Sequence, residues 1–192
     1  MRNRLALVAA MLAYSAIAQS PIVVDQRGGG DYLDIQSAVL AAQPGARIRV
    51  RSADYTSFTV NKSLHIFGDP GTTITGFPPR ITVRNIAANQ AVTVSGFRSA
   101  GSSPLAITVQ NCAGHIHLQD LVVDGRPGDF THGSAILDSG LVTAGHLKLV
   151  GSPALAIVRS SVTLDACELD GRIQKEANGL RCDRARVTLI DG

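Results

Sequence analysis

The first clear periodicity along the chain is helical and follows the glycine run Gly28-Gly29-Gly30. Apolar residues then recur at the spacing of one helix face, at Ile35, Ala38, Val39 and Ala42. Asp34 precedes them and can accept hydrogen bonds from the first free backbone N–H groups. Because Gln43-Pro44-Gly45 ends the pattern, the sequence predicts one short amphipathic helix.

Beyond Gly45 the helical period disappears, and short β-rich runs replace it. Each run has about three to five residues and is bounded by Gly, Asn, Asp or Ser. The first of them are residues 47–51, 58–60, 64–67, 72–75 and 80–83. The chain after the helix is therefore predicted to be all-β.

The β-rich runs also repeat. An alternating apolar pair returns at positions 92/94, 116/118, 142/144, 162/164 and 187/189, which are steps of 24, 26, 20 and 25 residues. Another run follows most pairs, at 121–125, 147–151 and 167–171, and a third precedes them, at 106–109, 135–137, 156–158 and 179–182. Three short strands per repeat with no helix between them exclude βαβ units, whose crossovers need about ten or more residues.

Such a repeat can bury its apolar residues only by stacking on its neighbours. We therefore predict a parallel β-helix (solenoid) with a short N-terminal capping helix, in which each strand pairs with its equivalent one turn on. A β-sandwich is the main alternative, but hairpin signals are rare and Asn178-Gly179 occurs once. The absence of tryptophan agrees with a narrow interior.

The N-terminal part resembles a known superfamily. The resemblance rests on Gly30-Asp31-Tyr32, Ile35-Gln36 and Ala38 within residues 25–39, and on residues 44–50, 61–68 and 72–76. These segments are similar to the opening of right-handed parallel β-helix proteins of the pectin-lyase-like superfamily, and in particular of pectin methylesterases. The resemblance implies a right-handed coil whose first turn is covered by the helix. It implies Ca²⁺ as the one conceivable cofactor, and the residues themselves indicate no cofactor or metal site.

Catalytic motifs of that superfamily are matched only in fragments. Gln119-Asp120, Gly114-His115-Ile116 and Arg172-Ile173-Gln174-Lys175 each fall short of the patterns used by methylesterases and polygalacturonases. His115 and His117 are expected to point to solvent from a strand whose Ile116 and Leu118 face inward. We therefore assign no catalytic residue from the resemblance.

The richest polar cluster lies in a long turn at residues 124–133. Its candidate substrate-binding residues are Asp124, Arg126, Asp129 and His132. The aspartates could act as an acid–base pair, the arginine could hold a carboxylate with two hydrogen bonds, and the histidine could move a proton. The alternative is a solvated loop whose Gly and Pro residues only turn the chain.

The N-terminus carries a targeting signal. Arg2 and Arg4 precede an apolar run of about 14 residues, which is shorter than the ~20 that a membrane span needs, and Ala16-Ile17-Ala18 fits a signal-peptidase site. We expect residues 1–18 to be a secretory signal peptide, 19–45 a linker with the capping helix, and 46–192 the coils, incomplete at the C-terminus. The protein is then secreted, extracellular or periplasmic, with no membrane contact after signal removal.

Charge and cysteine content narrow the choice of partners. The net charge of +3 falls to +1 without Arg2 and Arg4, because 16 basic residues then remain against 15 acidic ones. A nucleic-acid-binding domain is therefore not expected.

The three cysteines, Cys112, Cys167 and Cys182, allow at most one internal disulfide, and we interpret them as small buried hydrophobic residues.

The expected function is that of a secreted β-helix protein that binds or acts on an extracellular polysaccharide, as a lyase, hydrolase or esterase would. The alternative is a non-catalytic cell-surface or structural β-helix protein, or an inactive fragment of a larger one. The scarcity of aromatic residues, at 4% of the chain, favours this alternative, because carbohydrate binding commonly uses exposed aromatic rings. Whether the protein is catalytic and which oligomeric state it adopts stay open.

Overall fold

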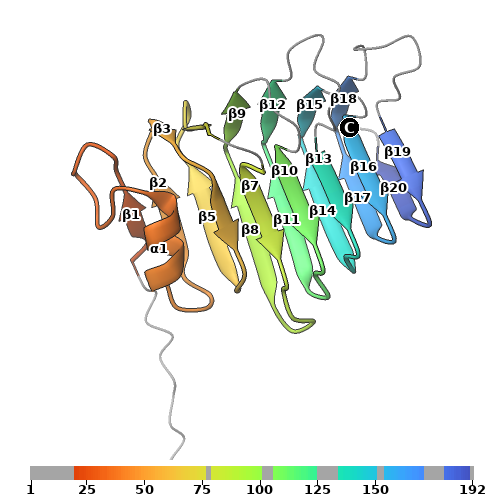
Figure 1. Ribbon diagram of the computed structural model, residues 1–192, viewed down its shortest axis with the longest axis horizontal. Coiled ribbons are helices and arrows are strands. Elements are labelled where there is room, and N and C mark those ends of the chain that lie inside the picture. Colours follow the sequence, from red (N-terminus) through yellow and green to blue (C-terminus); the bar gives the residue numbers. More distant parts are fainter. Residues whose placement is uncertain are drawn as a thin grey trace, which may run out of the picture.

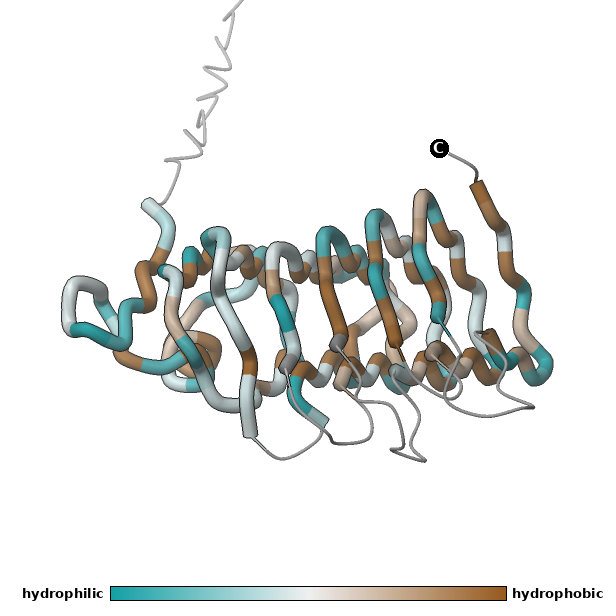
Figure 2. Tube along the Cα trace, turned by 90° about the horizontal axis from the view of Figure 1, so that it is seen from above, coloured by the Kyte–Doolittle hydropathy of each residue, from teal (hydrophilic) through white to brown (hydrophobic). Residues whose placement is uncertain are grey.

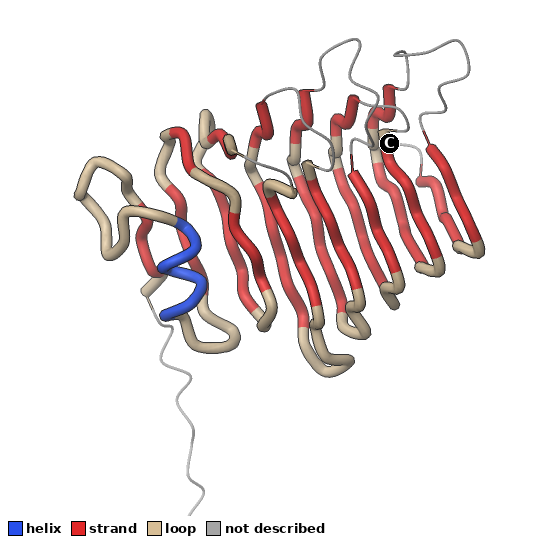
Figure 3. The backbone as a smooth tube through the Cα atoms, in the orientation of Figure 1, coloured by secondary structure: helices blue, strands red, loops and turns tan. Residues whose placement is uncertain are grey.

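The computed structural model describes residues 20–76, 79–100, 106–124, 134–150, 154–170 and 180–190. In these ranges the chain forms a parallel β-solenoid of about six turns with the single helix α1 (Ile35–Ala41) at one end (Figures 1 and 3). The predicted fold class is confirmed. Every strand pair recorded within the three sheets is parallel.

Sheet A has eight strands. In sheet order they are β1 (Ile22–Val24), β2 (Arg47–Val50), β5 (Leu64–Gly68), β8 (Ala91–Ser95), β11 (His115–Gln119), β14 (Leu141–Gly145), β17 (Ser161–Asp165) and β20 (Arg186–Ile190).

Sheets B and C have six strands each. Sheet B consists of β3 (Asp54–Tyr55), β6 (Thr73–Ile74), β9 (Arg98–Ala100), β12 (Val122–Asp124), β15 (Lys148–Val150) and β18 (Glu168–Asp170). Sheet C consists of β4 (Phe58–Val60), β7 (Ile81–Arg84), β10 (Ile107–Gln110), β13 (Ser134–Leu137), β16 (Leu155–Val158) and β19 (Leu180–Asp183).

The register of sheet A agrees with the sequence repeat position by position. Its pairing places five inward residues in one row, namely Val92, Ile116, Val142, Val162 and Val187. Figure 2 shows the successive turns of the solenoid side by side, with hydrophobic and hydrophilic residues alternating along the tube. The inward side chains form one continuous apolar core, because equivalent positions of successive turns lie about 4.8 Å apart.

The helix forms where the sequence predicts it and covers the first turn. Asp34 caps it, since its carboxylate accepts from the Ser37 backbone N–H at 2.8 Å and from the Ser37 hydroxyl at 2.7 Å. Ile35, Ala38 and Val39 are buried, and the helix contacts β1, β2 and β4. It therefore protects one open end of the solenoid.

The strand β1 was not predicted. It pairs with β2 at the edge of sheet A, before the glycine run that leads to the helix. Gly30 is required there, because a Cβ atom would lie 2.6 Å from the Val23 carbonyl oxygen. At Gly29 a Cβ atom would lie 2.8 Å from an Asp25 carboxylate oxygen, so the Asp25 side chain would have to move. The glycines thus let the chain turn tightly around the buried Asp25.

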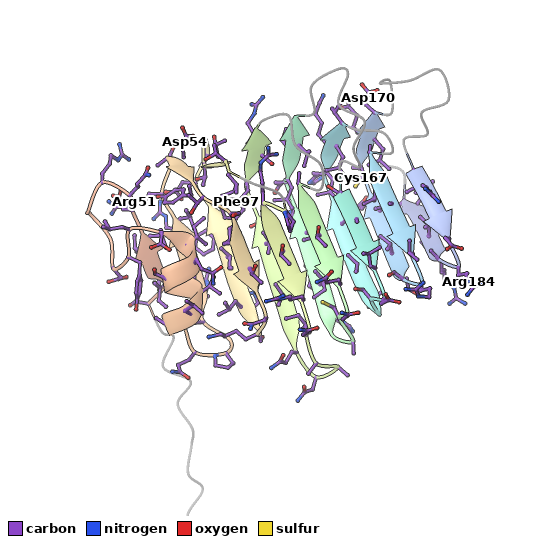
Figure 4. All side chains as sticks on the ribbon, viewed as in Figure 1. Arg51, Asp54, Phe97, Cys167, Asp170 and Arg184 are labelled. Carbon is purple, nitrogen blue, oxygen red and sulfur yellow. The ribbon has the colours of Figure 1, made fainter. Side chains whose placement is uncertain are left out.

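The solenoid has two sharp corners. In the A–B corner, single residues with positive φ connect sheet A to sheet B: Gly96, Asp120, His146 and Ala166. In the C–A corner, sheet C connects to sheet A through Asn85, Asn111, Asp138, Arg159 and Arg184. Figure 4 places Arg184 at the far end of the solenoid from α1.

The three cysteines are free and differ in burial. Cys112 is buried, and this burial raises the pKa of its thiol. Cys167 is half-buried against the core, whereas Cys182 on β19 is exposed, so the prediction that all three are buried is wrong for Cys182. Cys182 is exposed because β19 is the edge strand of sheet C among the described strands, so no further strand covers it. Its register partner Ile157, on the inner neighbour β16, is buried.

The one helix among the described residues, α1, has seven residues, which is too short for a membrane-spanning helix.

Candidate functional site

The turn predicted as a site, residues 124–133, lies almost entirely outside the described residues. Asp124 ends β12, where its backbone is in register with Ala100. Arg126, Asp129 and His132 lie outside the described residues, as does the side chain of Asp124. Their proposed convergence therefore stays a prediction, and the described residues direct attention to another surface.

That surface is the outward side of sheet A, here called the sheet A face. Along each strand, side chains alternate between the core and this face, as in the burial pattern of β2, where Arg47 and Arg49 are exposed and Ile48 and Val50 are buried. Parallel pairing aligns the central outward position of successive strands in one row. The row, called the central row, consists of Arg47, His65, Thr93, His117, Thr143, Thr163 and Thr188.

The α1 half of the sheet A face contains a hollow of about 460 Å³, here called the Arg47 hollow. It is lined by Arg47, His65, Ile66, Phe67, Thr93 and Ser95. The guanidinium carbon of Arg47 lies 5.7 Å from the centroid of the Phe67 ring, which is a cation–π distance. A cation, an aromatic ring and two hydroxyl groups thus converge on one concave surface.

Two neighbouring arginines on β2 differ in their electrostatics. Arg49 donates to both carboxylate oxygens of Asp69, from Nε at 2.9 Å and from Nη2 at 3.1 Å, and this hydrogen bonding raises the pKa of Arg49. Within the part of the chain that the structure describes, Arg47 has no carboxylate partner. The charge of Arg49 is therefore largely neutralised, while that of Arg47 remains available in the hollow.

A second, smaller hollow of about 340 Å³ lies on the other half of the same face. Its lining includes Leu141, Ser161, Thr163, Arg186 and Thr188. Both hollows lie along the central row. The sheet A face can therefore contact a long ligand at several points rather than one compact molecule at a single point.

Charged and titratable groups on this face are few. Among the described strands of sheet A, the only carboxylate is Asp165 on β17. His115 and His117 point outward as predicted, His115 exposed and His117 half-buried. The face is therefore weakly cationic, with Arg47 near α1 and Arg186 at the opposite end.

Sequence reasoning did not single out Arg47 or Phe67. Arg47 is one of two exposed arginines in a short strand, and Phe67 is the only Phe, Tyr or Trp in another. Only the register with His65, Thr93 and Ser95 places the two residues together. The alternation within β2 and β5 was a usable signal for their outward direction. Their convergence could not be read from the sequence repeat, because the first turns have irregular lengths. Register partners are 18 residues apart from Ile48 to Ile66 and 28 residues apart from Ile66 to Val94, whereas the later turns have 20 to 26 residues.

Comparison of the chain with protein-family models, with curated proteins and with solved structures found no match. The parallel β-solenoid is therefore established by the chain's own geometry, and the likeness to pectin-lyase-like proteins rests on the sequence segments that carry it.

Proposed function

We propose that this protein is a secreted, pectin-lyase-like β-helix protein that binds an extracellular polysaccharide along the sheet A face. The single observation that carries the proposal is the Arg47 hollow, where an arginine without a described carboxylate partner lies over an aromatic ring next to Thr93 and Ser95.

The chemistry of the hollow fits a sugar polymer that carries acidic groups. A guanidinium can donate two parallel hydrogen bonds to a carboxylate or sulfate. The Thr93 and Ser95 hydroxyls can donate to and accept from sugar hydroxyls. The Phe67 ring, which is half-buried, offers an apolar edge to a sugar ring.

The length of the face fits a polymer rather than a single sugar. Sheet A extends over eight strands, and each strand adds about 4.8 Å. The row of threonines beyond His117 continues the hydroxyl surface into the second hollow. Binding at several weak points in succession gives avidity without one deep pocket.

Binding without cleavage is the form of the function that the described residues support. Glycoside hydrolysis commonly uses two carboxyl groups facing each other, and among the described strands Asp165 is the sheet A face's single carboxylate. A structural role is the second candidate, because Phe67 is the only Phe, Tyr or Trp on the described strands of this face and sugar binding commonly uses more.

The test is a binding titration of the full chain against polygalacturonate, alginate and a neutral glucan, with and without the substitution Arg47→Ala. We expect the acidic polymers to bind better than the glucan. We also expect Arg47→Ala to weaken acidic-polymer binding by roughly tenfold, which corresponds to the loss of one charge-assisted contact.

The matched control is Arg84→Ala, which removes an exposed arginine from sheet C instead. Its binding should equal that of the unchanged chain. Equal binding by Arg47→Ala and Arg84→Ala would refute the sheet A face as the site. Loss of binding in Asp129→Ala or His132→Ala, with Arg47→Ala unaffected, would assign it to the 124–133 turn instead. No binding to any polymer would leave the structural role.

A further inference from the structure

Two histidine rings lie side by side on the sheet A face. His115 and His117 are two residues apart on β11, so both side chains point outward. Their ring centroids are 6.3 Å apart, with an angle of 63° between the ring planes. Neither imidazole has a hydrogen-bond or ion-pair partner among the described residues.

The neighbouring strands leave this pair accessible and place no charged side chain beside it. In register with His115 are Ala91 on β8 and Leu141 on β14, and in register with His117 are Thr93 and Thr143. Neither β8 nor β14 contains a charged residue. No neighbouring carboxylate or ammonium group on these strands therefore competes for the imidazole nitrogens.

We propose that His115 and His117 together bind a divalent transition-metal ion such as Zn²⁺, Ni²⁺ or Cu²⁺. With metal–nitrogen bonds of about 2.0–2.1 Å, two imidazoles on one ion have centroids about 4.5 Å apart at a 90° N–metal–N angle and about 5.3 Å apart at a tetrahedral angle. The observed separation of 6.3 Å therefore requires the two rings to move about 1 to 2 Å closer by side-chain rotation, which their outward position on the strand allows. Imidazole nitrogens suit these ions. Ca²⁺ and Mg²⁺ prefer oxygen ligands, so the pair does not provide the Ca²⁺ site that the superfamily resemblance implies.

The pair supplies two ligands. Within the described residues no group of three or more His, Cys, Asp or Glu side chains could hold a metal ion, so the other coordination positions are open to water.

The test is calorimetric titration of the tag-free full chain with Ni²⁺ at pH 7.5, alongside His115→Gln, His117→Gln and His65→Gln. His65→Gln is the matched control, because His65 lies in the same central row as His117 with Thr93 between them. We expect one ion per chain, and affinity reduced by roughly tenfold or more when either His115 or His117 is replaced. The His65→Gln variant should bind as the unchanged chain does.

A second readout separates ligation from an indirect effect of the substitutions. Substoichiometric Cu²⁺ should broaden the imidazole proton signals of His115 and His117 before those of His65 and His146. The proposal is overturned if the unchanged chain binds no Ni²⁺, if His115→Gln and His117→Gln bind as tightly as His65→Gln, or if the broadening begins at other histidines. None of these results bears on polysaccharide binding at the Arg47 hollow, which is measured in the presence of a chelator.

Discussion

The corners of the solenoid depend on single residues whose backbone most side chains avoid. Among the described residues, eight other than glycine have positive φ, with values between 46° and 58°. Five of the eight are Asn, Asp or His, which tolerate this conformation better than most residues. The corner N–H groups continue the ladder to the next turn, as in the 3.1 Å bond from Asp120 to the Gly145 carbonyl oxygen.

Ala166 is a poor residue for its corner. It has φ of 47°, and a Cβ atom in this region costs about 1 to 2 kcal/mol. Ala166→Gly should therefore stabilise the protein by up to about 1 kcal/mol, since glycine's greater freedom in the unfolded chain offsets part of the gain. Urea unfolding measures the change, and Ala156→Gly on β16 is the control, expected to destabilise by about 0.5 to 1 kcal/mol. A less stable Ala166→Gly would contradict the corner geometry.

Asp25 makes the α1 end of the solenoid sensitive to acid. Its carboxylate accepts from the Arg27 backbone N–H at 2.9 Å and from Arg51 Nη1 at 2.9 Å, and these contacts, the backbone one foremost, hold the pKa of Asp25 below its usual value. A carboxyl group whose pKa is lowered by folding stabilises the folded state at pH values above its ordinary, unfolded-state pKa. This stabilisation is lost as the pH falls through the lowered pKa of the folded state.

We therefore expect the unfolding temperature to drop below about pH 4. Asp25→Asn should be less stable at neutral pH and should show a smaller acid-induced drop. Asp54→Asn, at an exposed site on β3, is the control and should keep the full drop. An unchanged acid profile in Asp25→Asn would show that this contact does not contribute.

The strands are the elements that the sequence predicts best. Alternation of apolar and polar residues predicted both the existence and the pairing register of β8, β11, β14, β17 and β20, because a slip of one residue would turn each apolar row toward solvent. The two-residue strands β3 and β6 are too short for alternation to be visible, although the predicted β-rich run 72–75 includes β6. The strand β1 lacks a neighbouring repeat, so its pairing with β2 appears only in the structure.

The alternation makes a direct prediction about neighbouring strands. Ile116 on β11 is 0% exposed, and Leu141 on β14 is 40% exposed. Ile116→Ala should therefore destabilise the protein by about 2 to 5 kcal/mol, whereas Leu141→Ala should change stability by about 0.5 kcal/mol or less. Urea unfolding of the two variants side by side measures the difference. Equal losses would contradict the inward and outward assignment of sheet A.

At the scale of the whole molecule, the fold and the site are predictable to different degrees. A solenoid's core follows from a repeat in the sequence, since each turn needs only its neighbours. The Arg47 hollow depends on side chains from the three strands β2, β5 and β8, whose connecting turns differ in length. No short stretch of sequence shows that these side chains converge. The sequence analysis therefore placed its candidate site in the 124–133 turn, where the polar residues are neighbours in the sequence.

The two ends of the solenoid also differ. The α1 end is covered by the helix, whereas Leu189 and Ile190 on β20 are 67% and 49% exposed. Among the described strands, none pairs with the outer edge of β20. The sheet A face runs between these ends, which gives it one cationic end at Arg47 and another at Arg186.

The most direct test of the sheet A face as a polysaccharide site is an NMR titration of the full chain with polygalacturonate, which follows the imidazole signals in the presence of a chelator. His65 lines the Arg47 hollow, and His146 lies at the A–B corner beside Asp120, 3.2 Å from its carboxylate. We predict that the His65 signal shifts most on binding and that the His146 signal does not move. Binding that shifts the His132 signal and leaves His65 unchanged would contradict it.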